Sequence, residues 1–288
     1  MQWTDPASSV RVPEPILDWD VAYSNQLAVP EFPSWIGSAT EQSVRFHQQH
    51  AHRSEIDVKY GDHARHTFDV YEPSSGPAAG TVVFVHGGYW KASTKEQYRY
   101  LAAGPLARGW RVVLPEYPLC PEVTIAEIAT GLVPMIEEIA ARWNNTPVVL
   151  SGHSAGGHLV TYLASVGSGV SDAALRSIRR VVSLSGLHDL RPLIKATELN
   201  STLKLDPQSA HTLSPVLREP GGAFDLICAC GAAELAEFRR QNSALADVWF
   251  GFGNNVRIYE YAERNHFTLL DPMADGSSEL TALLTLES

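Results

Sequence analysis

The chain has 288 residues, of which 44% are hydrophobic and 19% are charged, so it is long enough to bury a sizeable core. Its formal net charge of −10 and isoelectric point near 5.5 give no general attraction to phosphate backbones or anionic lipids, which argues against nucleic-acid and membrane partners. No apolar run in the sequence approaches the length of a membrane span.

The first segment, residues 1–38, contains many prolines and aromatic side chains without sustained periodicity. This pattern predicts an extended arm or cap that packs on a surface, not a separate domain. Residues 1–20 have acidic side chains among prolines and no basic stretch ahead of an apolar core, so we expect no signal peptide. The sequence leaves open whether the arm covers its own active site or that of a neighbouring copy in a homodimer.

Three cysteines, an odd number, argue against a disulfide framework and favour a cytoplasmic protein. Cys228 and Cys230 alternate with alanine in an apolar, strand-like run, which predicts buried thiols. Residues 40–53 are mostly polar and compatible with a helix, on which His47 and His50 would share one face. Because no Asp, Glu or Cys accompanies these histidines at ligand spacing, we expect a solvated helix and neither a metal ion nor another cofactor.

The next elements predict the start of a sheet. Two short alternating runs, residues 55–60 and 66–71, flank a Gly-Asp turn and indicate an antiparallel hairpin at a sheet edge. Residues 81–85 form a continuous apolar run rich in β-branched side chains, which is typical of a strand buried on both faces.

Helices and strands alternate along the rest of the chain. We predict helices at residues 95–108, 125–142, 155–165, 236–250 and 276–286, and strands at residues 110–114, 147–150, 178–185, 225–230 and 256–261. The alternation indicates one α/β domain with a mostly parallel sheet, right-handed crossovers and helices on both faces, whose active site lies at the carboxyl ends of the strands. Residues 186–222, with several prolines and polar side chains, interrupt the alternation and predict a lid.

A Gly-His-Ser-Ala-Gly sequence at residues 152–156 joins a buried strand to a helix. A serine at the apex of such a turn is held in a strained backbone conformation with its Oγ exposed above the sheet edge. A plain strand-to-helix turn is the alternative interpretation. The surrounding strand and helix favour the first one, so we predict that Ser154 is a catalytic nucleophile.

A second motif, His-Gly-Gly-Tyr-Trp at residues 86–90, follows an earlier buried strand and therefore lies at the same sheet edge. Paired glycines allow the backbone to approach a ligand closely. We expect the N–H groups of Gly87, Gly88 and Ala155 to form an oxyanion hole. His86 is expected to brace this loop through side-chain hydrogen bonds and not to act as the base.

The base is expected after the last strand, in the chain order serine, acid, histidine. His266 follows the strand at residues 256–261 and is the histidine that fits by order and location. Glu234 follows the penultimate strand and is favoured as the acid on position. Asp189, after an earlier strand, remains the alternative, and Glu237 is a weaker third because it lies one turn into a helix.

These motifs, together with Ser-Gly-Leu-His-Asp-Leu at residues 185–190 and Asn-His-Phe at residues 265–267, resemble the α/β-hydrolase superfamily and, within it, the arylformamidase group and related esterases. The resemblance covers most of the chain from about Tyr23 onward. It implies the α/β-hydrolase fold and a triad of Ser154, Glu234 and His266, although the acid of these families is more often aspartate. It also implies hydrolysis of an N-formyl or other acyl bond on an aromatic amine such as N-formylkynurenine.

The expected chemistry is hydrolysis of a small acyl substrate through an acyl-enzyme. An aryl amide and an ester both suit these groups, because neither requires expulsion of a strongly basic amine. A carboxylesterase for small acyl esters is therefore the alternative, and a catalytically silent binding protein of the same fold is a third. We expect the pocket walls to come from the arm, Tyr89, residues 186–222 and Phe267.

Overall fold

The computed structural model describes residues 15–287. Residues 1–14 lie outside the described residues. They include the start of the predicted arm and most of residues 1–20, for which we expect no signal peptide.

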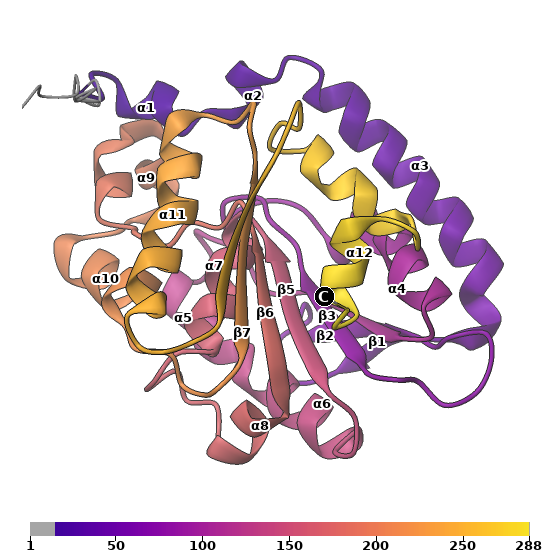
Figure 1. The fold of residues 1–288 in the computed structure, drawn as a ribbon. Coiled ribbons are helices and arrows are strands. Elements are labelled where there is room, and N and C mark those ends of the chain that lie inside the picture. Colours follow the sequence, from indigo (N-terminus) through magenta and orange to yellow (C-terminus); the bar gives the residue numbers. More distant parts are fainter. Residues whose placement is uncertain (1–14, 288) are drawn as a thin grey trace, which may run out of the picture.

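An eight-stranded sheet runs through the centre of the described chain (Figure 1). Its order is β1-β2-β4-β3-β5-β6-β7-β8. The strands are β1 (Ser54–Lys59), β2 (Thr67–Tyr71), β3 (Thr81–Val85), β4 (Arg111–Pro115), β5 (Val148–His153), β6 (Ile178–Leu184), β7 (Asp225–Gly231) and β8 (Val256–Tyr261). β2 pairs antiparallel with β1 and with β4, while all other neighbours are parallel. The predicted edge hairpin and mostly parallel sheet are therefore confirmed.

Side chains of the central strands alternate between two apolar clusters. In β3, Val82 and Phe84 belong to the cluster on one face, whereas Val83 and Val85 belong to the cluster on the other. Because both of its faces are buried, β3 is apolar along nearly its whole length, and the sheet requires a helical layer on each side.

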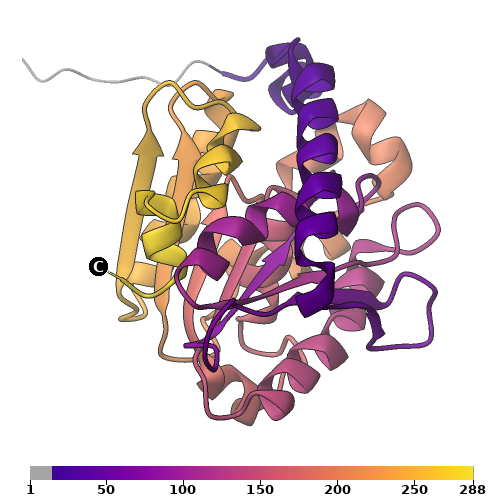
Figure 2. The same ribbon diagram turned by 90° about the vertical axis from the view of Figure 1, so that its right-hand side faces the viewer.

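Helices cover both faces of the sheet (Figures 1 and 2). One face carries α3 (Phe32–His50), α4 (Ala103–Ala107) and α12 (Glu279–Leu284). The other carries α5 (Ile125–Gly131), α6 (Val133–Arg142), α7 (Ala155–Leu163), α8 (Asp172–Ser177), α9 (Thr197–Leu203), α10 (Pro207–Thr212) and α11 (Ala236–Phe250). Short 3-10 helices span Ala51–Arg53, Lys95–Ala102, Pro192–Lys195, Pro215–Leu217 and Thr268–Ala274. No helix within residues 15–287 has both the length and the apolar character needed to cross a bilayer.

Prolines account for the main differences from the predicted helices. The single helix expected at residues 125–142 is divided into α5 and α6, and Pro134 occupies the first turn of α6. The helix expected at residues 95–108 is a 3-10 helix followed by the short α4, which contains Pro105.

The N-terminal arm is more helical than expected. α3 already begins at Phe32, inside the segment that we expected to be extended, with Pro33 in its first turn. On this helix Nδ1 of His47 lies 2.9 Å from the hydroxyl oxygen of Tyr71, and Nδ1 of His50 lies 2.8 Å from the carbonyl oxygen of Phe46. His47 thus fastens the helix to β2, whereas the bond of His50 stays within α3.

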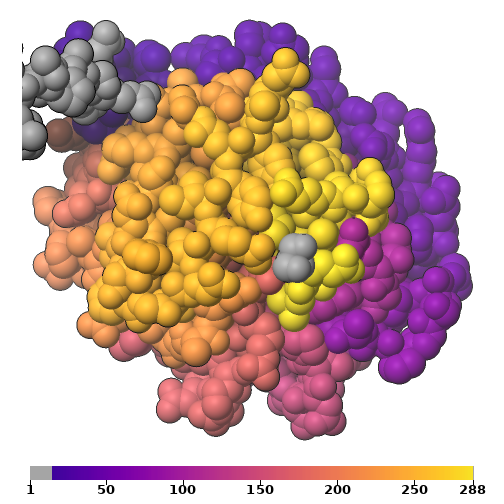
Figure 3. All heavy atoms as spheres, in the orientation of Figure 1, coloured from indigo at the N-terminus to yellow at the C-terminus, as the bar shows by residue number. Residues whose placement is uncertain are grey.

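The described part of the arm crosses the top of the molecule (Figure 3, indigo) and contains two short helices, α1 (Trp19–Ala22) and α2 (Asn25–Ala28) (Figure 1). The Asp20 carboxylate accepts hydrogen bonds from the Thr197 hydroxyl at 2.8 Å and the Glu198 N–H at 2.9 Å. These bonds cap the start of α9, where Ala196 has no side-chain cap to offer. The arm and residues 186–222 are therefore joined directly.

Two glycines provide a test of how closely α7 packs on the sheet. A Cβ added at Gly156 would lie 2.0 Å from the carbonyl oxygen of Val85, whereas one added at Gly37 within α3 would have no heavy atom within 4 Å. We expect Gly156→Ala to lower the free energy of unfolding by about 3 kcal/mol or more, and Gly37→Ala to raise it by up to about 1 kcal/mol. Urea denaturation measures both changes, and an unaltered midpoint for Gly156→Ala would contradict the packing described.

Candidate active site

Ser154 occupies a sharp turn between β5 and α7. Its φ of 56° and ψ of −118° lie in a region that non-glycine residues rarely adopt. Strand and helix approach so closely there that a Cβ at Gly152 would lie 2.2 Å from the carbonyl oxygen of Gly156. The predicted order of strand, tight turn and helix is thus present, and the glycines permit it.

Ser154 and His266 line the same cavity, which has a volume of about 310 Å³. The Ser154 side chain is not hydrogen-bonded within residues 15–287, which leaves the hydroxyl available to a molecule in the cavity. Hydrogen bonds between catalytic groups are often long without substrate and tighten when substrate binds.

His266 lies in the loop after β8 and contacts Glu234 in the loop after β7. The distance between Nδ1 of His266 and Oε2 of Glu234 is 2.8 Å, and both side chains are almost fully buried. The other carboxylate oxygen, Oε1, accepts the Gly231 N–H at 2.7 Å and the Ser185 hydroxyl at 2.5 Å. Because the carboxylate accepts a hydrogen bond from Nδ1–H, it favours the tautomer whose Nε2 lone pair is free to act as a base.

The two other candidate acids are engaged elsewhere. Asp189 pairs with Arg191, the Oδ1–Nε distance being 2.7 Å. Burial acts to raise the pKa of Asp189, but the hydrogen bonds from Arg191 outweigh it and hold that pKa below its usual value. Glu237 is bound by Arg240 and by the Tyr23 hydroxyl, each at 2.7 Å. Neither carboxylate is hydrogen-bonded to His266.

The His-Gly-Gly-Tyr-Trp loop lies beside the nucleophile turn. A Cβ added at Gly87 would lie 3.0 Å from the Cβ of Ser154, so only glycine permits this approach. Gly88 has a φ of 106° and also lines the cavity. Ala155 is the first residue of α7, where the backbone N–H has no partner within the helix. The three expected oxyanion-hole residues therefore surround Ser154.

His86 braces this loop, as expected from the sequence. Its Nδ1 lies 2.8 Å from the carbonyl oxygen of Gly87, and its Nε2 lies 3.0 Å from Oε1 of Glu116. Glu116 was missed by sequence reasoning, although it directly follows β4. Arg65 also binds its Oε1 at 2.6 Å, and the Lys95 N–H binds its Oε2 at 3.1 Å.

His153, which precedes the nucleophile, was also missed. Its Nε2–H donates to the carbonyl oxygen of His266 at 2.7 Å, and the two rings are 4.5 Å apart. Burial, with a smaller contribution from the charge of His266, holds the pKa of His153 well below its usual value. His153 therefore remains neutral and fixes the backbone of the His266 loop.

The arm forms part of the wall of the cavity that contains Ser154 and His266. The Phe32 and Phe267 rings lie 4.3 Å apart, and both line the cavity. The Tyr89 hydroxyl donates to the carbonyl oxygen of Tyr23 at 2.5 Å. Because this bond occupies the hydroxyl proton, we expect Tyr89 to contact a ligand through its aromatic ring. Leu199, from residues 186–222, lines the cavity as well.

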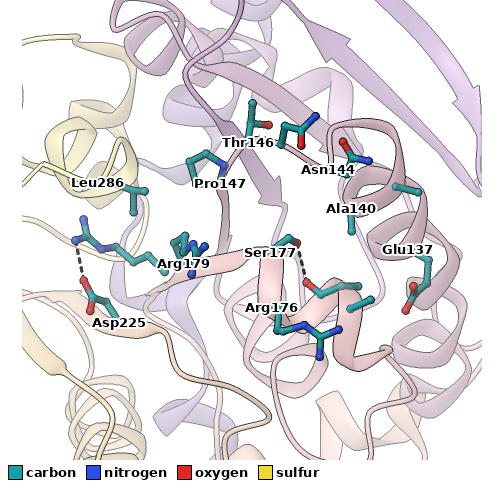
Figure 4. A pocket seen from close by; sticks show the side chains of 15 residues that line it. Glu137, Ala140, Asn144, Thr146, Pro147, Arg176, Ser177, Arg179, Asp225 and Leu286 are labelled. Carbon is teal, nitrogen blue, oxygen red and sulfur yellow. Dashed lines mark hydrogen bonds and ion pairs between the residues drawn. The ribbon is translucent and has the colours of Figure 1, made fainter.

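A larger cavity, of about 880 Å³, lies at the amino ends of β5, β6 and β7 (Figure 4). It is lined by arginines such as Arg179 and by small side chains, and it contains none of the proposed catalytic groups. The candidate active site is therefore chosen by the grouping of Ser154 and His266 and not by cavity size. Among residues 15–287, no set of three or more His, Cys, Asp or Glu side chains is arranged to hold a metal ion.

Comparison with protein families gives the same assignment of the fold. Residues 82–283, well over half of the chain, match the model of the alpha/beta hydrolase family. The chain belongs to this family. Among solved structures, that of a candidate thioesterase from Silicibacter sp. TM1040 is similar to this chain: it is 34% identical, the match covers 92% of this chain and 98% of that one, and the TM-score is 0.85.

Relatives of this alpha/beta hydrolase include two proteins named kynurenine formamidase. That of Danio rerio is 28% identical over 239 residues, or 80% of each chain, and that of Drosophila melanogaster is 26% identical over 79% of each chain. An esterase from Pyrobaculum calidifontis, 17% identical with a TM-score of 0.68 over 95% of this chain and 98% of its own, shares the fold.

Exchange of the carboxylate that contacts His266 distinguishes the candidate acids. We expect Glu234→Gln to lower kcat/KM by about 10³- to 10⁴-fold, because the amide favours the wrong imidazole tautomer. Asp189→Asn, the matched control, removes a buried charge without contact to His266 and should change kcat/KM by less than about threefold. Steady-state kinetics on an activated ester measures both, and the reverse order would assign the acid to Asp189.

Glu116 makes stability depend on pH. Burial acts to raise its pKa, but the hydrogen bond from His86 and the charge of Arg65 outweigh burial and hold the pKa below 4.5. The carboxylate therefore stabilises the fold above pH 4.5, and this contribution is lost as the pH falls through the lower, folded-state pKa. We expect Glu116→Gln to flatten the fall in unfolding free energy below pH 4.5, measured by urea denaturation; an unchanged slope would contradict this account.

Proposed function

We propose that this protein is a serine hydrolase that cleaves the N-formyl bond of an aryl formamide such as N-formylkynurenine. One observation carries the proposal: Ser154, in a strained turn, shares a cavity with His266, whose Nδ1 is hydrogen-bonded to the buried Glu234. Relatives of this chain carry the name kynurenine formamidase, which supports the choice of substrate.

In this mechanism Nε2 of His266 takes the proton of the Ser154 hydroxyl while Oγ attacks the formyl carbon. The N–H groups of Gly87, Gly88 and Ala155 stabilise the resulting oxyanion. The C–N bond then breaks, and His266 returns its proton to the departing arylamine. A water molecule, deprotonated by the same imidazole, attacks the formyl-serine, which releases formate and restores the hydroxyl.

The cavity agrees with an aromatic leaving group. Tyr23, Phe32 and Phe267 give it aromatic walls, and its volume of about 310 Å³ lies at the small end of the range for ligand sites. Lys91, exposed at the loop after the glycine pair, and Glu198 supply charges of both signs to its lining. Such a lining suits an aromatic molecule with polar substituents.

A carboxylesterase for small acyl esters is the second candidate. The same groups cleave esters, and solved esterases share this fold. A catalytically silent binding protein is the third candidate, which would leave Ser154 unreactive. We further propose a cytoplasmic location, because Cys120, Cys228 and Cys230 are free and buried.

The decisive measurement compares kcat/KM for N-formylkynurenine with that for p-nitrophenyl acetate and p-nitrophenyl butyrate. We expect the formamide to be preferred, because its ring meets the aromatic wall whereas its acyl group is minimal.

A preference for the esters would overturn the formamidase assignment in favour of the esterase. Labelling with a fluorophosphonate tests the nucleophile, and Ser154→Ala is the control. If the unaltered protein were not labelled, or if Ser154→Ala were labelled equally, Ser154 would not be the nucleophile and the silent binding protein would be favoured.

A further inference from the structure

Ser185 follows the last residue of β6 and has an unusual backbone conformation. Its φ is 52°, which non-glycine residues seldom adopt, and its side chain is fully buried. The Ser185 N–H donates to the carbonyl oxygen of Ala229 in β7 at 2.7 Å, so the neighbouring strand fixes the backbone at this point. Strained residues that are held this firmly are concentrated at functional sites.

The Ser185 hydroxyl contacts the carboxylate behind the base. It donates to Oε1 of Glu234 at 2.5 Å, and the Gly231 N–H donates to the same oxygen at 2.7 Å. The second oxygen, Oε2, is thereby left to His266. Two donors on one oxygen and one donor on the other fix the rotation of the carboxylate plane.

The end of β6 also contacts the nucleophile turn. The carbonyl oxygen of Leu184 accepts the Ser154 N–H at 2.8 Å, and Ser185 is the next residue. Two adjacent residues therefore set the positions of the serine and of the acid relative to each other.

We propose that Ser185 is a positioning residue for the triad acid, an inference that rests on the hydrolase function proposed above. Glutamate has one more rotatable bond than aspartate, so fixing its carboxylate in one orientation costs more conformational entropy. The Ser185 hydroxyl and the Gly231 N–H hold the longer side chain so that Oε2 faces Nδ1 of His266. Ser185 acts through Glu234 and does not touch the reacting atoms.

Ser183 offers a matched control on the same strand. It is equally buried, and its Oγ lies 3.0 Å from Nε2 of His188, away from Glu234 and His266. If the Ser185 hydroxyl only satisfied buried polar groups, removing it would change kcat no more than removing the Ser183 hydroxyl. A positioning role predicts a difference in catalysis between the two.

The experiment measures kcat, KM and the pH profile of p-nitrophenyl acetate hydrolysis for Ser185→Ala, Ser185→Gly and Ser183→Ala in the full chain. We expect both Ser185 variants to lower kcat by about 10- to 100-fold with KM nearly unchanged, because a hydrogen bond to a charged group is lost. Ser185→Gly also removes the unfavourable positive φ, so it tests the hydroxyl independently of any effect of Ser185→Ala on folding. Ser183→Ala should retain kcat within about threefold.

The acid limb of the kcat/KM profile should move to higher pH in both Ser185 variants. A carboxylate that has lost a donor holds the proton on the adjacent imidazole more strongly. The other titratable groups that face the pair are His153, Tyr89 and Cys230, and all three are unaltered in these variants.

Three outcomes overturn the inference: a kcat near that of the unaltered protein for both Ser185 variants, an equal loss in Ser183→Ala, or an acid limb that does not move. Ser154→Ala separates this failure from that of the proposed function. If Ser154→Ala is inactive while the Ser185 variants are fully active, only the role of Ser185 is refuted. If Ser154→Ala keeps its activity, the hydrolase mechanism itself is refuted.

Discussion

The close approach of α7 to the carboxyl ends of β3 and β5 is the constraint on which the rest of the site depends. Gly152 and Gly156 allow backbone atoms to meet where any Cβ would collide with a carbonyl group. That contact forces the positive φ of Ser154 and aims the start of α7 at the cavity. The loop of Gly87 then fits against the turn, because it too lacks a side chain at the point of contact.

Much of this architecture could be predicted from the sequence, because it depends on local patterns. Apolar β-branched runs such as residues 81–85 identify strands buried on both faces, and glycines flanking a serine identify the turn. Chain order placed His266 and Glu234 after the last two strands, and the structure brings the two together at 2.8 Å. Helix ends were less accurate, since Pro134 and Pro105 divide segments whose apolar periodicity is continuous.

What could not be predicted depends on contacts between distant parts of the chain. Glu116 and Ser185 carry no motif of their own, and their importance arises from His86 and Glu234, which the fold brings to them. The start of α3 was missed for a related reason. Its helix is stabilised by packing on residues 95–102, while its own sequence has weak periodicity. Asp189 stayed an alternative to Glu234 in the sequence, and the structure distinguishes them because Glu234 contacts His266 at 2.8 Å whereas Asp189 pairs with Arg191.

The cap that Asp20 provides for α9 makes two distant segments mechanically dependent on each other. The same junction includes Lys195 stacked over the Trp19 ring at 5.0 Å. Any separation of the arm from residues 186–222 must therefore break a helix cap and a cation–π contact together. A chimera that exchanged residues 186–222 alone would separate α9 from the Asp20 cap on which its first turn depends, so the two segments would have to be exchanged together.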